Sequence, residues 1–170
     1  MAAFRDEPSS WERLDYQALR DGALLYFSND VLERDVAWLM GERYETQVFD
    51  CRTWKSELDF HRDVAVRLRF PDYYGENLDA FNDCMRDLAV PDDGGTVLVF
   101  RGIDAFHRQR SKVVWHMVDI LLGTAHSNLL LGRRLLTFLQ SDDPRFSLEP
   151  AGAWGVKWNR REWLDANRGL

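Results

Sequence analysis

The sequence predicts an α/β fold with a small, mainly parallel β-sheet flanked by helices. Short apolar runs typical of strands alternate with segments at helical spacing, the pattern of a sheet built from strand–helix–strand units. The clearest run, residues 96–100 (TVLVF), is apolar after its first residue, as expected for a strand covered on both faces. No internal repeat and no low-complexity linker interrupt the 170 residues, so we expect one domain over residues 1–170.

The first quarter of the chain predicts a strand and a helix. Residues 22–28 (GALLYFS) form a short apolar run typical of a buried strand. Residues 31–43 place apolar side chains near helical spacing, with Gly41 as the expected stop. Residues 44–51 (YETQVFDC) alternate and predict a second strand. We therefore expect an added N-terminal strand–helix unit in residues 1–43.

Two helices are expected in the middle of the chain. Ser56 and Asp59 have the spacing of a capping box that opens the first helix, and Pro71 prevents its continuation. The apolar face of this helix consists of Phe60, Val64 and Leu68. The second helix is expected from about Leu78 to Ala89, with Asn77 as its candidate N-cap.

The last part of the chain predicts a long helix from about Ser111 and a last clear strand at residues 133–140 (RRLLTFLQ). The tail after Pro144 is rich in tryptophan and basic residues: Trp154, Lys157, Trp158, Arg160, Arg161 and Trp163. We interpret the three tryptophans as packing against one edge of the sheet. The alternative is a nucleic-acid surface, because aromatic rings interleaved with Arg and Lys stack bases.

The composition is that of a globular protein, with 45% hydrophobic and 29% charged residues. No apolar run reaches the roughly 18 residues that a membrane-spanning helix needs. The N-terminus lacks the apolar core of a secretory signal. We therefore expect a cytoplasmic protein in which Cys51 and Cys84 are free thiols.

The net charge of −6 is concentrated in one segment. Residues 71–93 hold seven acidic residues and one base, Arg86, whereas the rest of the chain is balanced. Such a patch attracts positively charged partners and repels nucleic acid. The expected partner is a basic protein, with no nucleic acid and no membrane.

The helix in this acidic segment carries a row of carboxylates. Asp79, Asp83 and Asp87 fall within an arc of roughly 80° on a helix. The opposite side is apolar, with Phe81, Met85 and Leu88. A solvated helix face usually pairs Glu with Lys at four-residue spacing, and this face does not. A rigid row of short carboxylates suits pairing with Arg, Lys or His of a partner, and a merely solvated face is the alternative.

Motifs for catalysis are missing from the sequence. It has no Gly-rich phosphate loop, no nucleophile elbow and no zinc-ligand spacing among its four histidines. Cys84 is a poor candidate nucleophile, because neighbouring carboxylates raise the pKa of a thiol. We expect no catalytic residue, no cofactor and no metal. The least favoured hypothesis is an enzyme whose reaction these motifs do not reveal.

Residues 71–88 (PDYYGENLDAFNDCMRDL) resemble the signature of the barstar family, intracellular inhibitors of the secreted ribonuclease barnase. The resemblance covers about residues 44–140, including Phe60-His61 and the two later strands. It leaves residues 1–43 as an N-terminal extension and residues 141–170 as a Trp-rich C-terminal extension. The resemblance implies a small parallel sheet flanked by helices. It also implies that the acidic helix and the preceding loop plug the nuclease active site by mimicking RNA phosphates.

Carried over residue by residue, the resemblance implies a partner-binding surface. Asp79 and Asp83 match the family's interface aspartates, and the Asp83 position is the one that occupies the phosphate site. This chain has Asn82 and Arg86 where the family has an aromatic and a small neutral residue, and residues 127–131 are neutral where the family has acids. The expected partner-binding residues are Tyr73, Gly75, Asn77, Leu78, Asp79, Asn82, Asp83, Arg86 and Asp87.

The expected function is stoichiometric inhibition, of the immunity or antitoxin type, of a barnase-like extracellular ribonuclease or another basic nuclease or toxin. The alternative is a protein-interaction module on the same fold, whose basic partner is not a nuclease. Arg86 has two alternative roles. It either pairs with Asp83 in the free protein or contacts an acid on the partner.

Overall fold

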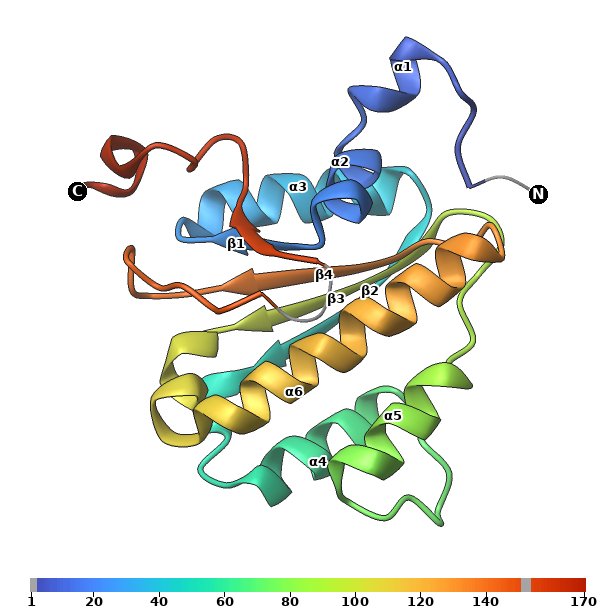
Figure 1. Ribbon diagram of the computed structural model, residues 1–170, viewed down its shortest axis with the longest axis vertical. Coiled ribbons are helices and arrows are strands. Elements are labelled where there is room, and N and C mark those ends of the chain that lie inside the picture. Colours follow the sequence, from blue (N-terminus) through green and yellow to red (C-terminus); the bar gives the residue numbers. More distant parts are fainter. Residues whose placement is uncertain (1–2, 151–153) are drawn as a thin grey trace.

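The computed structural model describes residues 3–150 and 154–170. It is an α/β structure in which five parallel strands lie between two layers of helices (Figure 1). The strands are β1 (Ala23–Tyr26), β2 (Tyr44–Asp50), β3 (Gly95–Arg101), β4 (Leu135–Gln140) and β5 (Val156–Trp158). The helices are α1 (Pro8–Trp11), α2 (Leu14–Asp21), α3 (Asn29–Gly41), α4 (Glu57–Arg67), α5 (Leu78–Arg86) and α6 (Ile103–Leu130). Two short 3-10 helices cover Cys51–Thr53 and Asp165–Arg168. None of the helices in the described ranges is long and apolar enough to cross a membrane.

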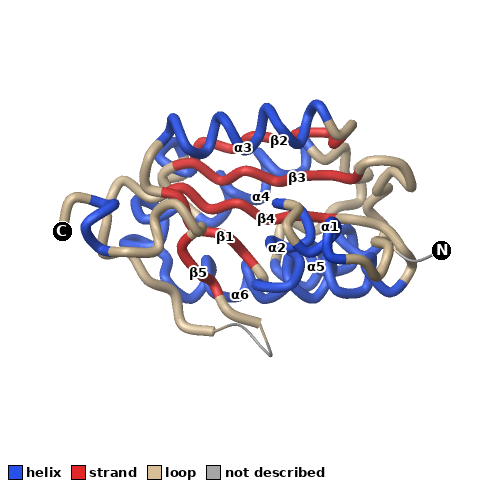
Figure 2. The backbone as a smooth tube through the Cα atoms, turned by 90° about the horizontal axis from the view of Figure 1, so that it is seen from above, coloured by secondary structure: helices blue, strands red, loops and turns tan. Residues whose placement is uncertain are grey.

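The strand order is β2-β3-β4-β1-β5 (Figure 2). Every neighbouring pair is parallel. The predicted fold class is confirmed, and the predicted run at residues 22–28 supplies β1 beside β4. Strand β5, which lies in the Trp-rich extension at the outer edge of the sheet, was not predicted. Its three residues are too short to produce a recognisable pattern of alternation.

The direction of each connection explains which helices cover which face. Crossovers between parallel strands are almost always right-handed, so connections that run in opposite directions along a sheet lie on opposite faces. The connections β2–β3 and β3–β4 run one way and carry α4, α5 and α6, whereas the connection from β1 back to β2 carries α3 on the other face (Figure 1). The acidic helix and α6 therefore share one side of the molecule.

The alternation of side chains along the strands produces two cores. In β3, Leu98 and Phe100 belong to the cluster under α6, and Val97 and Val99 belong to the cluster under α3. All residues of β3 except Arg101 are buried, as predicted for this central strand. The sheet thus supports α5 through the side chains of α6 and α4 that pack in the same core.

Two helix boundaries differ from the sequence prediction. Helix α6 starts at Ile103 rather than near Ser111, and its backbone is non-helical at Arg110 (φ −143°, ψ 55°). Residues 104–110 are mostly polar and charged, so they lack the apolar spacing from which the later part was predicted. The acidic helix ends at Arg86 rather than near Ala89. Asp87 is consequently its C-cap and lies outside the helix proper.

The C-terminal extension is tied to the sheet by a buried carboxylate. Glu162, only 2% exposed, accepts hydrogen bonds from the backbone N–H groups of Phe27 (3.0 Å) and Ser28 (2.7 Å). These donors lie where the chain leaves β1 and enters α3. In doubly wound folds such a crevice, at the carboxyl ends of strands whose connections diverge to opposite faces, is the usual ligand site. Here the chain's own carboxylate fills it.

The three tryptophans of this extension differ in burial. Trp154 packs against His126 of α6, with ring centroids 4.6 Å apart, and the Arg168 guanidinium lies 4.4 Å from the Trp158 ring. Both tryptophans are partly buried against the core under α6. Trp163 is 62% exposed. The packing interpretation is therefore confirmed for Trp154 and Trp158 and is wrong for Trp163.

Candidate protein-binding site

The loop before α5 is held by aromatic packing beneath it. Helix α4 opens with the predicted Ser56–Asp59 capping box and ends at Arg67, and Arg69 then takes a left-handed backbone (φ 55°). Phe70 turns inward, where its ring lies 5.0 Å from that of Tyr74 and 6.2 Å from that of Phe81. The loop from Phe70 to Asn77 is thus fastened to the core under α5.

A buried histidine supports the same loop from α4. His61 is fully buried, and its Nδ1 lies 2.5 Å from the Tyr74 hydroxyl oxygen while its Nε2 lies 3.5 Å from Glu57 Oε1. This geometry fits a neutral imidazole that accepts the Tyr74 hydroxyl at Nδ1 and donates to Glu57 from Nε2. Burial lowers the pKa of His61, which favours this neutral form. Tyr74 therefore fixes the loop from within, whereas its neighbour Tyr73 is 85% exposed.

Asn77 begins α5 and uses both ends of its side chain to do so. Its Oδ1 accepts the N–H of Ala80 (2.9 Å), the predicted N-cap bond, and its Nδ2 donates to the carbonyl oxygen of Gly75 (3.1 Å). Glu76 between them adopts a left-handed backbone (φ 48°). Gly75 and Asn77, two of the predicted partner-binding residues, thus shape the loop in the free protein.

The carboxylate row is exposed, as the helical spacing predicted. Asp79, Asp83 and Asp87 are exposed, while Phe81 and Met85 on the opposite side of α5 are fully buried. No ion pair involves these three aspartates within residues 3–150 and 154–170. Their charges therefore face solvent uncompensated.

The other acids of residues 71–93 contribute less unpaired negative charge than the sequence implied. Glu76 pairs with Arg62 (3.4 Å), Asp92 with Arg133 (2.8 Å) and Asp93 with Arg43 (2.5 Å). Three of the seven acids in residues 71–93 are thus neutralised by bases from elsewhere in the chain. In the part of the chain that the structure describes, the acids of this segment without an ion-pair partner are the row on α5 and Asp72 in the preceding loop.

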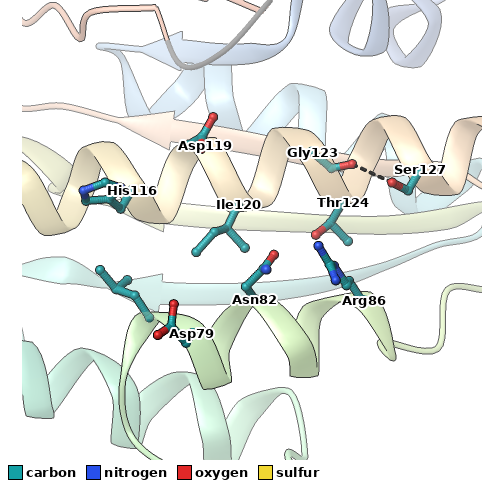
Figure 3. A pocket seen from close by; sticks show the side chains of 10 residues that line it. Asp79, Asn82, Arg86, His116, Asp119, Ile120, Gly123, Thr124 and Ser127 are labelled. Carbon is teal, nitrogen blue, oxygen red and sulfur yellow. Dashed lines mark hydrogen bonds between the residues drawn. The ribbon is translucent and has the colours of Figure 1, made fainter.

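The remaining predicted residues line a groove between α5 and α6. This groove has a volume of about 560 Å³, and Leu78, Asp79, Asn82 and Arg86 form its α5 wall. Figure 3 shows Asn82 and Arg86 directed toward α6. Arg86 makes no ion pair with Asp83 in the structure as described, so the first of its two possible roles does not apply. Leu78 is half-buried and packs against the core.

The opposite wall of the groove was not foreseen. It comes from α6: His116, Asp119, Ile120, Gly123, Thr124 and Ser127. The available signal in the sequence was Gly123, a glycine inside the helix predicted from about Ser111. A glycine in a helix interior costs stability relative to alanine, so its presence there was informative.

The cysteines and histidines form no alternative site. Cys51 is buried and Cys84 is half-buried, both as free thiols. Burial, together with the carboxylates of Asp87 and Asp83, raises the pKa of Cys84. No cluster of His, Cys, Asp and Glu that would hold a metal ion occurs within the ranges that the structure describes.

The fold and the site together define an α/β domain that presents an exposed carboxylate row on a helix held by a tightly packed loop. The chain belongs to the barstar family. The family model described as barstar (barnase inhibitor) matches residues 44–140, which is more than half of the chain. The match covers α4, α5 and α6 together with β2, β3 and β4, and leaves β1, α3 and β5 in the extra N- and C-terminal segments. A search of the curated proteins found no match.

Proposed function

We propose that this protein is a stoichiometric inhibitor of a barnase-like ribonuclease or a similar basic nuclease or toxin. Helix α5 and the loop from Phe70 to Asn77 enter the cationic active site of that enzyme. The observation that carries the proposal is the exposed row Asp79–Asp83–Asp87, which makes no ion pair among the described residues. The chain carries this row as a member of the family described as barstar (barnase inhibitor). The protein acts inside the cell as an immunity protein or antitoxin.

The chemistry of the site supports this proposal. Phosphates of RNA are bound by Arg, Lys and His, and short carboxylates on a rigid helix offer the same charge at similar spacing. Carboxylates one turn apart repel each other, and Asp87 lies at the negative end of the helix dipole, so the arrangement costs stability in the free protein. A cationic partner relieves that cost.

The test is inhibition of RNA cleavage by barnase and by a panel of purified barnase-like ribonucleases. We expect the activity of at least one of these nucleases to fall to zero at one inhibitor per enzyme. Stopped-flow association with that enzyme should slow as salt rises, because the Debye length shortens to about 8 Å at physiological ionic strength and weakens steering.

A salt-independent association rate would contradict the electrostatic part of the proposal. The departures from the family pattern at Asn82 and Arg86 favour a second hypothesis, in which the same surface binds a basic protein that is not a nuclease. If no nuclease of the panel is inhibited while a basic protein without nuclease activity binds in an Asp83-dependent manner, the second hypothesis holds instead.

A further inference from the structure

One end of the groove between α5 and α6, the end at Arg86, differs in charge from the carboxylate row beside it. The α5 wall of the groove begins with Asp79 and ends with Arg86. The Arg86 side chain points across the groove toward Thr124 of α6 (Figure 3). No carboxylate pairs with Arg86 in the parts of the chain that the structure describes, although Asp83 and Asp87 flank it in sequence. An exposed guanidinium that turns away from nearby acids leaves its donors available to a ligand.

Other hydrogen-bond donors lie at the same end of the groove. The Asn82 side chain points toward α6, and the Thr124 hydroxyl points into the space above Arg86 (Figure 3). The Ser127 hydroxyl is not a free donor, because its single O–H already donates to the carbonyl oxygen of Gly123 (3.0 Å). A guanidinium with an amide and a hydroxyl beside it matches the acceptors of a carboxylate.

Gly123 gives independent support for a ligand in this groove. It lies inside α6, where glycine is unfavourable, and a Cβ added to it would meet nothing within 4 Å. Packing within this chain therefore does not require glycine at this position. The missing side chain widens the groove wall directly beside Thr124, at the end where Arg86 lies.

From these observations we infer that the groove binds an aspartate or glutamate side chain of the partner, with Arg86 as its ion-pair partner. The inference rests on the proposed function, because the partner must already be seated on α5. The inference also adds a requirement for the partner. The cationic surface of the partner must carry an acidic side chain that reaches the groove. Arg86 then rejects partners with a base at that position and acts as the specificity-determining residue.

The first test uses acetyl-glutamate amide as a probe of the free protein. Titration followed by NMR should shift the signals of Asn82, Arg86, Gly123 and Thr124, and the Arg86→Gln variant should lose these shifts. Arg145→Gln, a change of another exposed arginine, is the matched control and should keep them. Shifts that are absent, or that persist in Arg86→Gln, would overturn the anion-binding groove.

The second test uses the panel nuclease that binds most tightly, after Asp83→Ala has been shown to abolish that binding. Arg86→Glu should then lower the affinity by at least about tenfold, as expected for a buried charge pair that turns repulsive. Gly123→Ala should raise the Tm and yet lower the affinity. Gly41→Ala is the matched control, because Gly41 is also a helical glycine with no neighbour within 4 Å but lies on the other face of the sheet.

The outcomes separate the two proposals. If Asp83→Ala abolishes binding while Arg86→Glu and Gly123→Ala leave the affinity within twofold, the groove inference is wrong and the proposed function stands. If no panel nuclease binds, or if Asp83→Ala binds as well as the wild type, the proposed function fails. The acetyl-glutamate amide titration still decides the groove in that case.

Discussion

Asp83 occupies the middle of the carboxylate row, one helical turn from both Asp79 and Asp87. A cationic pocket that receives the row is therefore centred on it. Removing one member of a hydrogen-bonded charge pair that is buried in a complex costs about 2–5 kcal/mol of binding. In the free protein the same change relieves repulsion between like charges at four-residue spacing.

We accordingly expect Asp83→Ala to remove most inhibition and to leave the Tm equal or higher. Calorimetry with the inhibited nuclease and thermal unfolding of the free variant measure the two effects. Glu149→Ala, which removes an exposed acid outside the row, is the control of equal charge and should change neither. Undiminished affinity of Asp83→Ala would exclude a plug mechanism centred on this helix.

His61 makes the loop sensitive to pH. Because burial lowers the pKa of His61 below its ordinary 6.5, the folded state favours the neutral imidazole more than the unfolded state does. The resulting stability is fully present above pH 6.5 and is lost as the pH falls from 6.5 toward the lowered value. His107, whose pKa burial also lowers, acts in the same direction.

Urea unfolding at about pH 7.5 and about pH 5.5 measures this loss. We expect the wild type to lose more stability between these two values than His61→Gln, and His107→Gln to report the part that comes from His107. The carboxylates with lowered pKa, such as Asp21 and Asp59, titrate below their ordinary 3.8 and do not interfere in this range. Equal pH dependence of wild type and His61→Gln would show that His61 is not the sensor.

At the scale of single elements, α5 depends on its N-cap more than a longer helix would. It has nine residues, and Asn77 both caps it and closes the preceding loop onto Gly75. Loss of an N-cap side chain costs about 0.5–2 kcal/mol. Replacement of Asn77 should therefore change the position of the loop relative to the carboxylate row.

We expect Asn77→Ala to lower the free energy of unfolding by about 1 kcal/mol and to weaken partner binding as well. Asn77→Asp preserves the cap acceptor and should keep most of the stability. Ser56→Ala, which removes the cap of α4, controls for a general loss of helix stability and should affect binding less. Equal effects of Asn77→Ala and Ser56→Ala on affinity would show that the loop bond to Gly75 has no role in binding.

The elements also show how far the sequence alone leads. Apolar runs and capping residues are local signals, and they predicted β1 to β4, the capping box of α4 and the Asn77 cap. Strand β5 and the polar first turns of α6 carry no such local signal, because they depend on contacts with β1 and with Asp142. At the candidate site, the carboxylate row on α5 was predicted from its helical spacing. The α6 wall and the ion pairs that neutralise Glu76, Asp92 and Asp93 required the tertiary structure.

At the scale of the whole molecule, the extensions complete the sheet that supports the site. Strand β1 covers the edge of β4, and α2 and α3 cover the face opposite α6. Residues 44–140 taken alone would expose Val97, Val99, Leu136 and Phe138 on that face. Burial of such a side chain contributes about 1.5–3 kcal/mol, so four of them match the roughly 5–15 kcal/mol by which a typical domain is stable.

We therefore expect the fragment 44–140 to lack a cooperative fold and to associate through its exposed face and the β4 edge. Glu162→Ala in the full chain is the milder variant, because it keeps both extensions but leaves the N–H groups of Phe27 and Ser28 without their buried acceptor. It should lower the free energy of unfolding by about 1.5–3 kcal/mol, the range for hydrogen bonds to a charged group. Its α5 surface lies on the other side of the sheet, so nuclease affinity at a temperature well below the Tm should stay unchanged. Urea unfolding measures the stability of the Glu162→Ala variant, and size-exclusion chromatography and circular dichroism test the association and folding of fragment 44–140. A monomeric fragment 44–140 that unfolds cooperatively would show that the barstar-like part does not need its extensions.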